Sequence, residues 1–144
     1  GLSIRADRIA EFRARMNERA LAIFAEGPKP AEVEASLAVD LRDIDDEGLT
    51  WLRRFEPFGP RNEAPLFYAE DVEIRGEPRL VGDKHLKFAV RAGNGNVLNA
   101  IGFNLGHMMD RVDGRDRLAR IVFHPEWNSF RGRRSIQLRV VALE

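Results

Sequence analysis

The sequence contains no cysteine, so it forms neither a disulfide nor a thiolate metal site. Its three histidines, His85, His107 and His124, are scattered and lack partners at the spacing of zinc ligands, which argues against a zinc site. No apolar run approaches the ~20 residues of a membrane-spanning helix, and the N-terminus shows no signal-peptide pattern. Neither a phosphate-binding glycine loop nor a nucleophile elbow is present. We therefore expect a chain from a reducing compartment, with no membrane partner, no cofactor of its own and no catalytic residue.

The 144 residues have a formal net charge of zero, but the charges are segregated along the chain. Residues 31–78 carry five Lys or Arg against thirteen Asp or Glu, whereas residues 79–144 carry twelve against six. A basic segment of this kind is typical of a surface that meets an anionic partner such as nucleic acid. The alternative is that folding mixes the segments and cancels the field. Arginine outnumbers lysine twenty to three, which is also consistent with a bias in genomic composition.

The first part of the chain predicts two helices and a strand. Apolar residues at helical spacing predict a helix over about 5–24, which the segment EGPKP ends. Alternating apolar residues predict a strand over 33–41. The acids at 43–47 precede a second helix, expected over about 46–55, because the helix dipole favours acids in the first turn. Their oxygens could instead bind a divalent ion, which we consider the weaker interpretation. Because the chain starts with Gly1 rather than Met, we expect a fragment of a longer protein.

From residue 66 onward the pattern changes to strands. Period-two alternation and turn signals at 76–78 and 93–96 predict strands over 66–74, 79–91, 97–103, 117–124 and 134–143. Between the third and fourth strands, Asn104 is placed to cap a short helix over about 105–112. Three strands, a helix and two strands form the order of a five-stranded OB-fold Greek-key barrel. We predict a mainly β chain in which residues 1–38 form an N-terminal helix and linker, the end of a preceding domain, and residues 39–144 form the OB-fold domain.

Four segments carry a family resemblance: EPFGPRNEAPLF (residues 56–67), VGDKHLKFAVR, AIGFNLG and NSFRGRRSIQLRV. Their order and spacing resemble the C-terminal OB region of the RecJ family, single-strand-specific exonucleases of the DHH phosphoesterase type. The resemblance covers about Val39 to Glu144, and FRARMNERA is similar to the helix that ends the preceding DHH-associated domain. The chain departs from the pattern at Glu63-Ala64-Pro65, where Asn-Pro-Glu-Pro is usual, and at Phe130, where Trp is common. The metal-binding Asp/His motifs of the family's nuclease core are missing.

The proline-rich segment 56–67 has a structural interpretation. Each proline fixes its own φ near −65° and biases the preceding residue towards an extended backbone. Pro57 is therefore expected to end the helix, Gly59-Pro60 to turn the chain, and Pro65 to lead into the first barrel strand. We expect this segment to be a rigid support that holds the OB domain against the part of the protein that precedes it.

The resemblance implies a function for the longer protein. It implies a 5′–3′ exonuclease of the bacterial cytoplasm that acts on single-stranded DNA in recombination and repair, with Mg²⁺ or Mn²⁺ in its catalytic domains. The partners implied are single-stranded DNA, the rest of the parent nuclease and single-strand binding protein. Two roles for the OB domain remain open: it binds DNA, or it is an interaction module that docks the nuclease core or a partner protein.

OB-folds usually bind nucleic acid across their second and third strands, flanked by the loops after strands one and four. Sequence-neutral binding needs cations along the phosphates and aromatic rings on which bases stack. The candidates are Arg75, Arg79 and Lys84 near the first loop, His85, Lys87 and Arg91 on the second strand, and Trp127, Phe130, Arg131, Arg133 and Arg134 in the second loop. The alternative is that Trp127 and Phe130 are buried anchors of their loop and the arginines a solvated surface.

Overall fold

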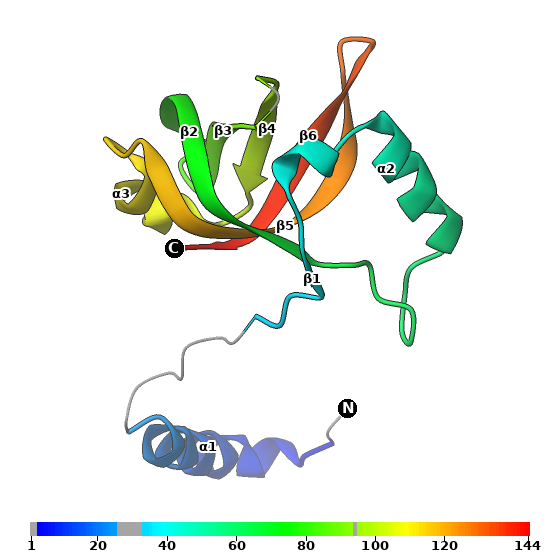
Figure 1. Cartoon of the computed structure of the whole chain (residues 1–144). Coiled ribbons are helices and arrows are strands. Elements are labelled where there is room, and N and C mark those ends of the chain that lie inside the picture. Colours follow the sequence, from blue (N-terminus) through cyan, green and yellow to red (C-terminus); the bar gives the residue numbers. More distant parts are fainter. Residues whose placement is uncertain (1–2, 26–32, 94) are drawn as a thin grey trace. The chain divides into compact units, whose positions relative to one another are not determined.

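The computed structural model describes residues 3–25, 33–93 and 95–144, and for Phe130 only the backbone. The chain divides into two compact units, Gly1–Glu32 and Val33–Glu144. The first unit contains a short 3-10 helix, η1 (Ala6–Arg8), followed by α1 (Ile9–Ile23), which confirms the predicted helix (Figure 1). Glu11 forms ion pairs with Arg8 at 2.7 Å and Arg15 at 2.9 Å, contacts that add a few tenths of a kcal/mol to a helix.

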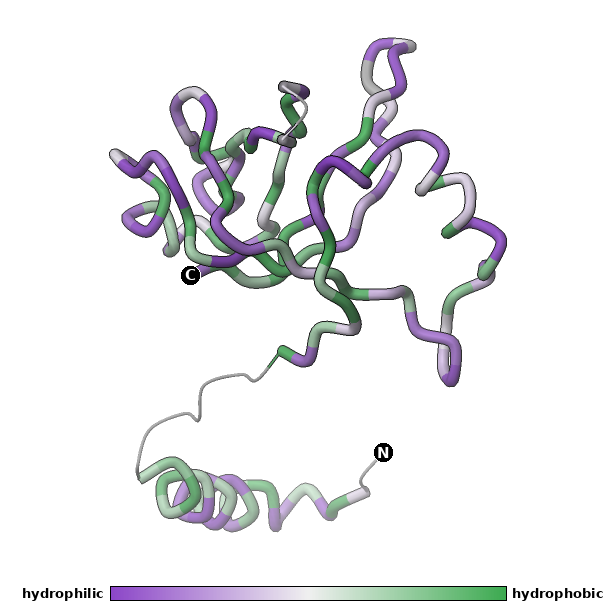
Figure 2. The backbone as a smooth tube through the Cα atoms, viewed as in Figure 1, coloured by the Kyte–Doolittle hydropathy of each residue, from purple (hydrophilic) through white to green (hydrophobic). Residues whose placement is uncertain are grey.

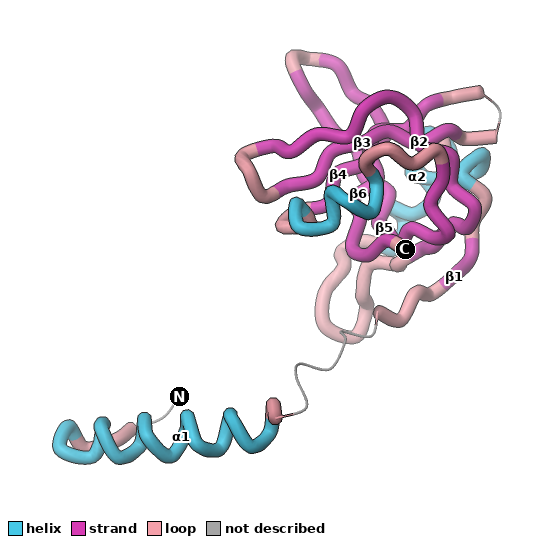
Figure 3. The backbone as a smooth tube through the Cα atoms, turned by 90° about the vertical axis from the view of Figure 1, so that its left-hand side faces the viewer, coloured by secondary structure: helices cyan, strands magenta, loops and turns pink. Residues whose placement is uncertain are grey.

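The second unit is a closed five-stranded barrel with one additional short strand (Figure 3). The barrel strands are β2 (Phe67–Val81), β3 (His85–Arg91), β4 (Val97–Gly102), β5 (Arg117–Phe130) and β6 (Arg133–Leu143). They pair in the order β2-β3-β4-β6-β5, and β5 returns to β2 to close the ring. All pairs are antiparallel except β4–β6. This is the OB-fold topology that the sequence predicts. The sixth strand, β1 (Leu37–Ala38), adds to β2 in parallel.

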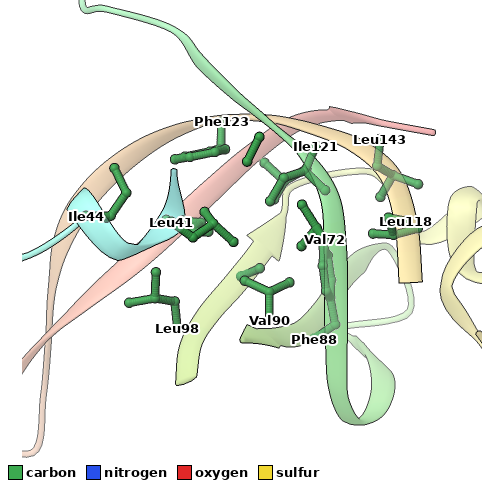
Figure 4. Close-up of a cluster of buried hydrophobic side chains, with 14 of the residues drawn as sticks. Leu41, Ile44, Val72, Phe88, Val90, Leu98, Leu118, Ile121, Phe123 and Leu143 are labelled. Atoms are coloured by element: carbon green, nitrogen blue, oxygen red, sulfur yellow. The ribbon is translucent and has the colours of Figure 1, made fainter. Parts of the chain in front are cut away.

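The barrel interior is filled by the apolar residues that alternate along the strands (Figure 4). Fully buried side chains include those of Leu86, Val90, Ile121, Phe123 and Leu138. One end is closed by the helical segment between β4 and β5, which comprises η4 (Gly106–Met108) and α3 (Met109–Val112) and buries Val112. At the other end lie Leu41 and Ile44, from η2 (Leu41–Asp43) and the residue after it. Hydrophilic residues gather at the tip of the β5–β6 hairpin (Figure 2).

One predicted turn and one predicted loop need correction, and in each case a strand is longer than expected. Instead of turning at 76–78, β2 continues to Val81, with a register shift against β3 between Arg75 and Arg79. The chain reverses at residues 82–84. Gly76 has a φ of +68° in this bulge, and a bulge also accommodates the missing N–H of Pro78. Likewise the predicted loop 125–133 is a long hairpin whose turn consists of Arg131 and Gly132.

Two smaller predictions also need correction. The strand expected over 33–41 is only Leu37–Ala38, because this segment pairs with β2 at two residues. Asn104 does not cap the following helix with its side chain. Its φ is +59° and its backbone N–H donates to His85, while η4 starts after Leu105 without a side-chain cap.

The proline-rich segment joins the second predicted helix to the barrel. That helix is α2 (Asp46–Leu52) with the 3-10 turn η3 (Arg53–Phe55), and Asp45 caps it by accepting the Gly48 N–H at 2.8 Å. The Asn62 side-chain amide donates to the carbonyl oxygens of Phe55 and Pro57, at 2.8 and 3.0 Å. These bonds hold the segment in one folded loop. No helix in the described part of the chain is long and apolar enough to cross a membrane.

Candidate nucleic-acid interface

The outer surface of β3 is the first part of the candidate interface. Lys87 pairs with Arg79 of β2 on one side and with Ile101 of β4 on the other. Because directly paired residues point to the same side of a sheet, and Leu86 and Phe88 point inward, these three side chains form one outward row. The neighbouring row contains His85 and, just after β4, Phe103. We call this surface the β3 face, consisting of Arg79, His85, Lys87, Ile101 and Phe103.

His85 and Phe103 are held together at the edge of the β3 face. Their ring centroids are 5.2 Å apart at an angle of 74°, an edge-to-face contact. The Asn104 backbone N–H donates to Nδ1 of His85 at 3.0 Å, so in the neutral imidazole the proton is on Nε2. Phe103 nevertheless remains 49% exposed. The β3 face therefore offers a positioned, accessible aromatic ring beside a hydrogen-bond donor.

Lys84 lies in the turn that borders the β3 face. The Gly106 N–H donates to the Lys84 carbonyl oxygen at 2.9 Å, which holds η4 against this turn. A Cβ at Gly106 would lie 3.0 Å from the Lys84 backbone, so the close approach favours glycine. Among the described residues, Arg79, Lys84 and Lys87 take part in none of the ion pairs. Their charge is available to an incoming anion.

Arg75 and Arg91, which the sequence placed in the same candidate set, are already paired. Both contact Glu73: Arg91 Nε lies 3.3 Å from Oε2, and Arg75 binds Oε1. Elsewhere Arg117 donates two hydrogen bonds to the Asp71 carboxylate and a third to the Asp71 carbonyl oxygen, and Arg120 binds Glu70 at 2.7 Å. The bonds to the carboxylates raise the pKa of each arginine. On this side the acidic and basic segments do neutralise each other, as the alternative interpretation of the charge pattern expects.

The β5–β6 hairpin carries the other candidates. Trp127 lies within β5, pairs with Ile136 and packs against the barrel core. The Arg134 guanidinium lies 3.9 Å from the centre of its indole ring. Trp127 therefore belongs to a strand of the hairpin and not to a loop, and Arg134 lies over its ring. Arg131 lies in the hairpin turn and Arg133 directly follows it, and both are exposed, whereas the side chain of Phe130 lies outside what the structure describes.

A groove of about 440 Å³ lies between α2, the proline-rich segment and β5. Its apolar lining includes Leu49, Leu52, Phe58, Pro65, Pro125 and Trp127, and charged residues border it. One ring nitrogen of His124, Nδ1, lies 2.9 Å from the carbonyl oxygen of Pro65 and fastens the segment to the barrel. Burial, and to a lesser extent the charge of Arg139, lowers the pKa of His124. No sequence pattern indicated this groove, because its lining comes from segments far apart in the chain.

Phe103 is the main residue of the candidate interface that sequence reasoning missed. The signal was present: it continues the outward series of the third strand after Val97, Asn99 and Ile101, on the surface where OB-folds bind strands. No three His, Asp or Glu side chains in the described ranges gather as a metal site.

Comparisons with known proteins agree with the fold. A family model described as the RecJ OB domain matches residues 36–142. A Bacillus subtilis protein named single-stranded-DNA-specific exonuclease RecJ is 25% identical over 141 residues, covering 97% of this chain and 18% of that protein. The Escherichia coli K12 protein of the same name is 30% identical over 151 residues, covering 96% and 24%. The chain thus spans about a quarter or less of the length of these relatives.

A solved structure shows the same architecture. The crystal structure of Thermus thermophilus RecJ in complex with Mn²⁺ matches with a TM-score of 0.61 and 22% sequence identity, covering 100% of this chain and 20% of that one. At this identity the match concerns the fold.

Proposed function

Because the chain belongs to the RecJ OB domain family, we propose that it is the single-stranded-DNA-binding module of a RecJ-like 5′–3′ exonuclease, acting in recombination and repair in the bacterial cytoplasm. The relatives that it matches are named for single-stranded DNA. In the longer protein, metal-dependent hydrolysis takes place in other domains, and this module holds the strand.

The observation that carries the proposal is the composition of the β3 face. Arg79 and Lys87, with Lys84 in the adjoining turn, have no acidic partner among the described residues, and an exposed Phe103 lies beside them. Cations that follow phosphates, combined with a ring on which a base stacks, are the elements of sequence-tolerant strand binding. The Nε2–H of His85 is a further donor for a phosphate or base oxygen.

Titration of a fluorescent oligo-dT with the chain at several salt concentrations tests the proposal. Lys87→Gln is expected to flatten the slope of log affinity against log salt by about 0.7, the value for one phosphate contact on a single strand. Phe103→Ala is expected to weaken binding by about 1–3 kcal/mol with little change in that slope, because a stack is not ionic.

Arg61→Asn is the matched control. It removes one exposed positive charge from the proline-rich loop, and asparagine tolerates the φ of +70° at this position. Its binding curve is expected to match that of the unchanged chain. Equal losses for Arg61→Asn and Lys87→Gln would indicate a diffuse charge effect and contradict binding at the β3 face.

The groove beside α2 favours a second candidate function, the docking of a protein. Its apolar lining suits a hydrophobic side chain from the parent's own core or from single-strand binding protein. This function predicts binding of purified single-strand binding protein without DNA, weakened by Phe58→Ala and unaffected by Lys87→Gln. The reverse pattern would assign the protein contact to the β3 face.

A further inference from the structure

A second, smaller pocket of about 320 Å³ lies between α2–η3 and the β5–β6 hairpin, which are neighbours in Figure 1. Its lining is Thr50, Arg53, Arg54, Glu56, Trp127 and Arg134. It contains none of the residues of the β3 face. Three of its six residues are arginines, and of these only Arg134 is among the candidates derived from the sequence.

Two arginine–tryptophan stacks flank this pocket. The Arg54 guanidinium lies 3.9 Å from the centre of the Trp51 ring, and the Arg134 guanidinium lies at the same distance from the Trp127 ring. A guanidinium that lies over a ring keeps the N–H groups at its edge for other partners. The stack also restricts the arginine rotamers, so less conformational entropy is lost when these N–H groups bind a ligand.

The pocket has an excess of positive charge. Its one acidic side chain, Glu56, approaches Arg53 with Oε2 at 3.8 Å from Nε, a longer separation than a charge-assisted hydrogen bond. Arg54 and Arg134 have no acidic partner among the ion pairs of the described residues. Paired N–H groups at a guanidinium edge match two oxygens of one phosphate.

We propose that this pocket binds a phosphate group of a single-stranded nucleic acid, internal or terminal, at a point separate from the β3 face. The inference rests on the proposed function, since it assigns a second contact to the same ligand. Arg53, Arg54 and Arg134 would donate to the phosphate oxygens, and Trp51 and Trp127 would hold two of these arginines in place.

The chain provides its own reporter, because Trp51 and Trp127 are its two tryptophans and both belong to the stacks. We expect a saturable change in tryptophan fluorescence when oligo-dT or inorganic phosphate is added at constant ionic strength. The change is expected to disappear in the double variant Arg53→Gln/Arg54→Gln and to persist in Arg115→Gln. Arg115 lies after α3, which closes the end of the barrel opposite η2.

Further arms separate the sources of the phosphate. A response to unphosphorylated oligo-dT indicates an internal phosphate, and a response that requires a 5′- or 3′-phosphorylated oligonucleotide indicates a terminal one. Arg53→Gln alone removes a side chain that stacks on neither tryptophan, so it tests the site without loosening the hairpin. It is expected to weaken oligonucleotide binding about fivefold and to flatten the salt slope by about 0.7.

Failure of this inference is distinguishable from failure of the proposed function. If Lys87→Gln weakens binding while Arg53→Gln and the double variant leave affinity, salt slope and fluorescence response unchanged, the phosphate pocket is refuted and the β3 face stands. If the chain binds no oligonucleotide, the proposed function fails. The fluorescence response to inorganic phosphate then decides whether the pocket binds a phosphate group. The phosphate pocket is refuted if the fluorescence response is equal in the unchanged chain and the double variant, or absent from both.

Discussion

Replacing Trp127 by alanine separates an anchoring role from a base-stacking role. Truncating a fully buried tryptophan costs about 3–5 kcal/mol. Trp127 is only partly buried, but it packs on the core, pairs with Ile136 and lies under Arg134. We therefore expect a loss of about 2–3 kcal/mol, of which roughly 0.5–1 comes from the cation–π contact. For a domain of about a hundred residues, this lowers the Tm by roughly 10 °C.

Paired melting and titration curves provide the assay. Circular dichroism melts give the Tm of the unchanged chain, of Trp127→Ala and of the control Trp51→Ala. Trp51 is 53% exposed, so its truncation is expected to cost less than about 1 kcal/mol. At a temperature where all three are folded, Trp127→Ala is expected to reduce oligonucleotide affinity at most about threefold, through looser alignment of Arg134. A Tm within about 2 °C of the unchanged chain, together with a loss of affinity of more than about tenfold, would refute the anchoring role.

Three further predictions concern the whole chain. Removal of residues 1–32 is expected to leave the barrel folded, because residues 33–144 form a compact unit with their own core, and an unfolded circular dichroism spectrum would show otherwise. The pKa of His124 is lowered in the folded state, so below about pH 6.5 the unfolded state binds more protons and the folded state loses stability. The Tm is therefore expected to fall less between about pH 7.5 and 5.5 in His124→Gln than in the unchanged chain. An identical fall in the two proteins would contradict the assignment to His124. The chain alone is expected to hydrolyse no labelled oligonucleotide with Mg²⁺ or Mn²⁺, and cleavage that survives repurification would contradict this.

The order of elements was predictable from the sequence because local patterns determine it. Period-two alternation and the glycine–asparagine turn identified all five barrel strands, and helical spacing identified the segment before β5. The lengths of β2 and of the β5–β6 hairpin were not predictable in the same way. Pro78 and Pro125 indicate loops when considered alone, yet both lie within strands whose neighbours and register accommodate them.

The candidate interface was predictable only in part, because its availability depends on partners that are distant in sequence. Lys87 and His85 were found from alternation, since a strand's outward side follows from its period. The pairing of Arg91 with Glu73 depends on how β2 and β3 are aligned, and a bulge determines that alignment. Trp127 was assigned to an open loop because the hairpin that contains it had not been recognised. Alternation indicates that Phe103 points outward, but only the structure shows that its ring remains exposed.

The most direct test of the central claim, binding of a strand at the β3 face, is photo-crosslinking of an oligonucleotide that contains 5-iododeoxyuridine. Crosslinked peptides from the complex would be identified by mass spectrometry, with excess unlabelled oligo-dT as the competition control. We predict competable crosslinks within residues 85–103, at Phe103 or His85, and their loss in Phe103→Ala. Competable crosslinks that fall elsewhere, with none in residues 85–103, would contradict the claim.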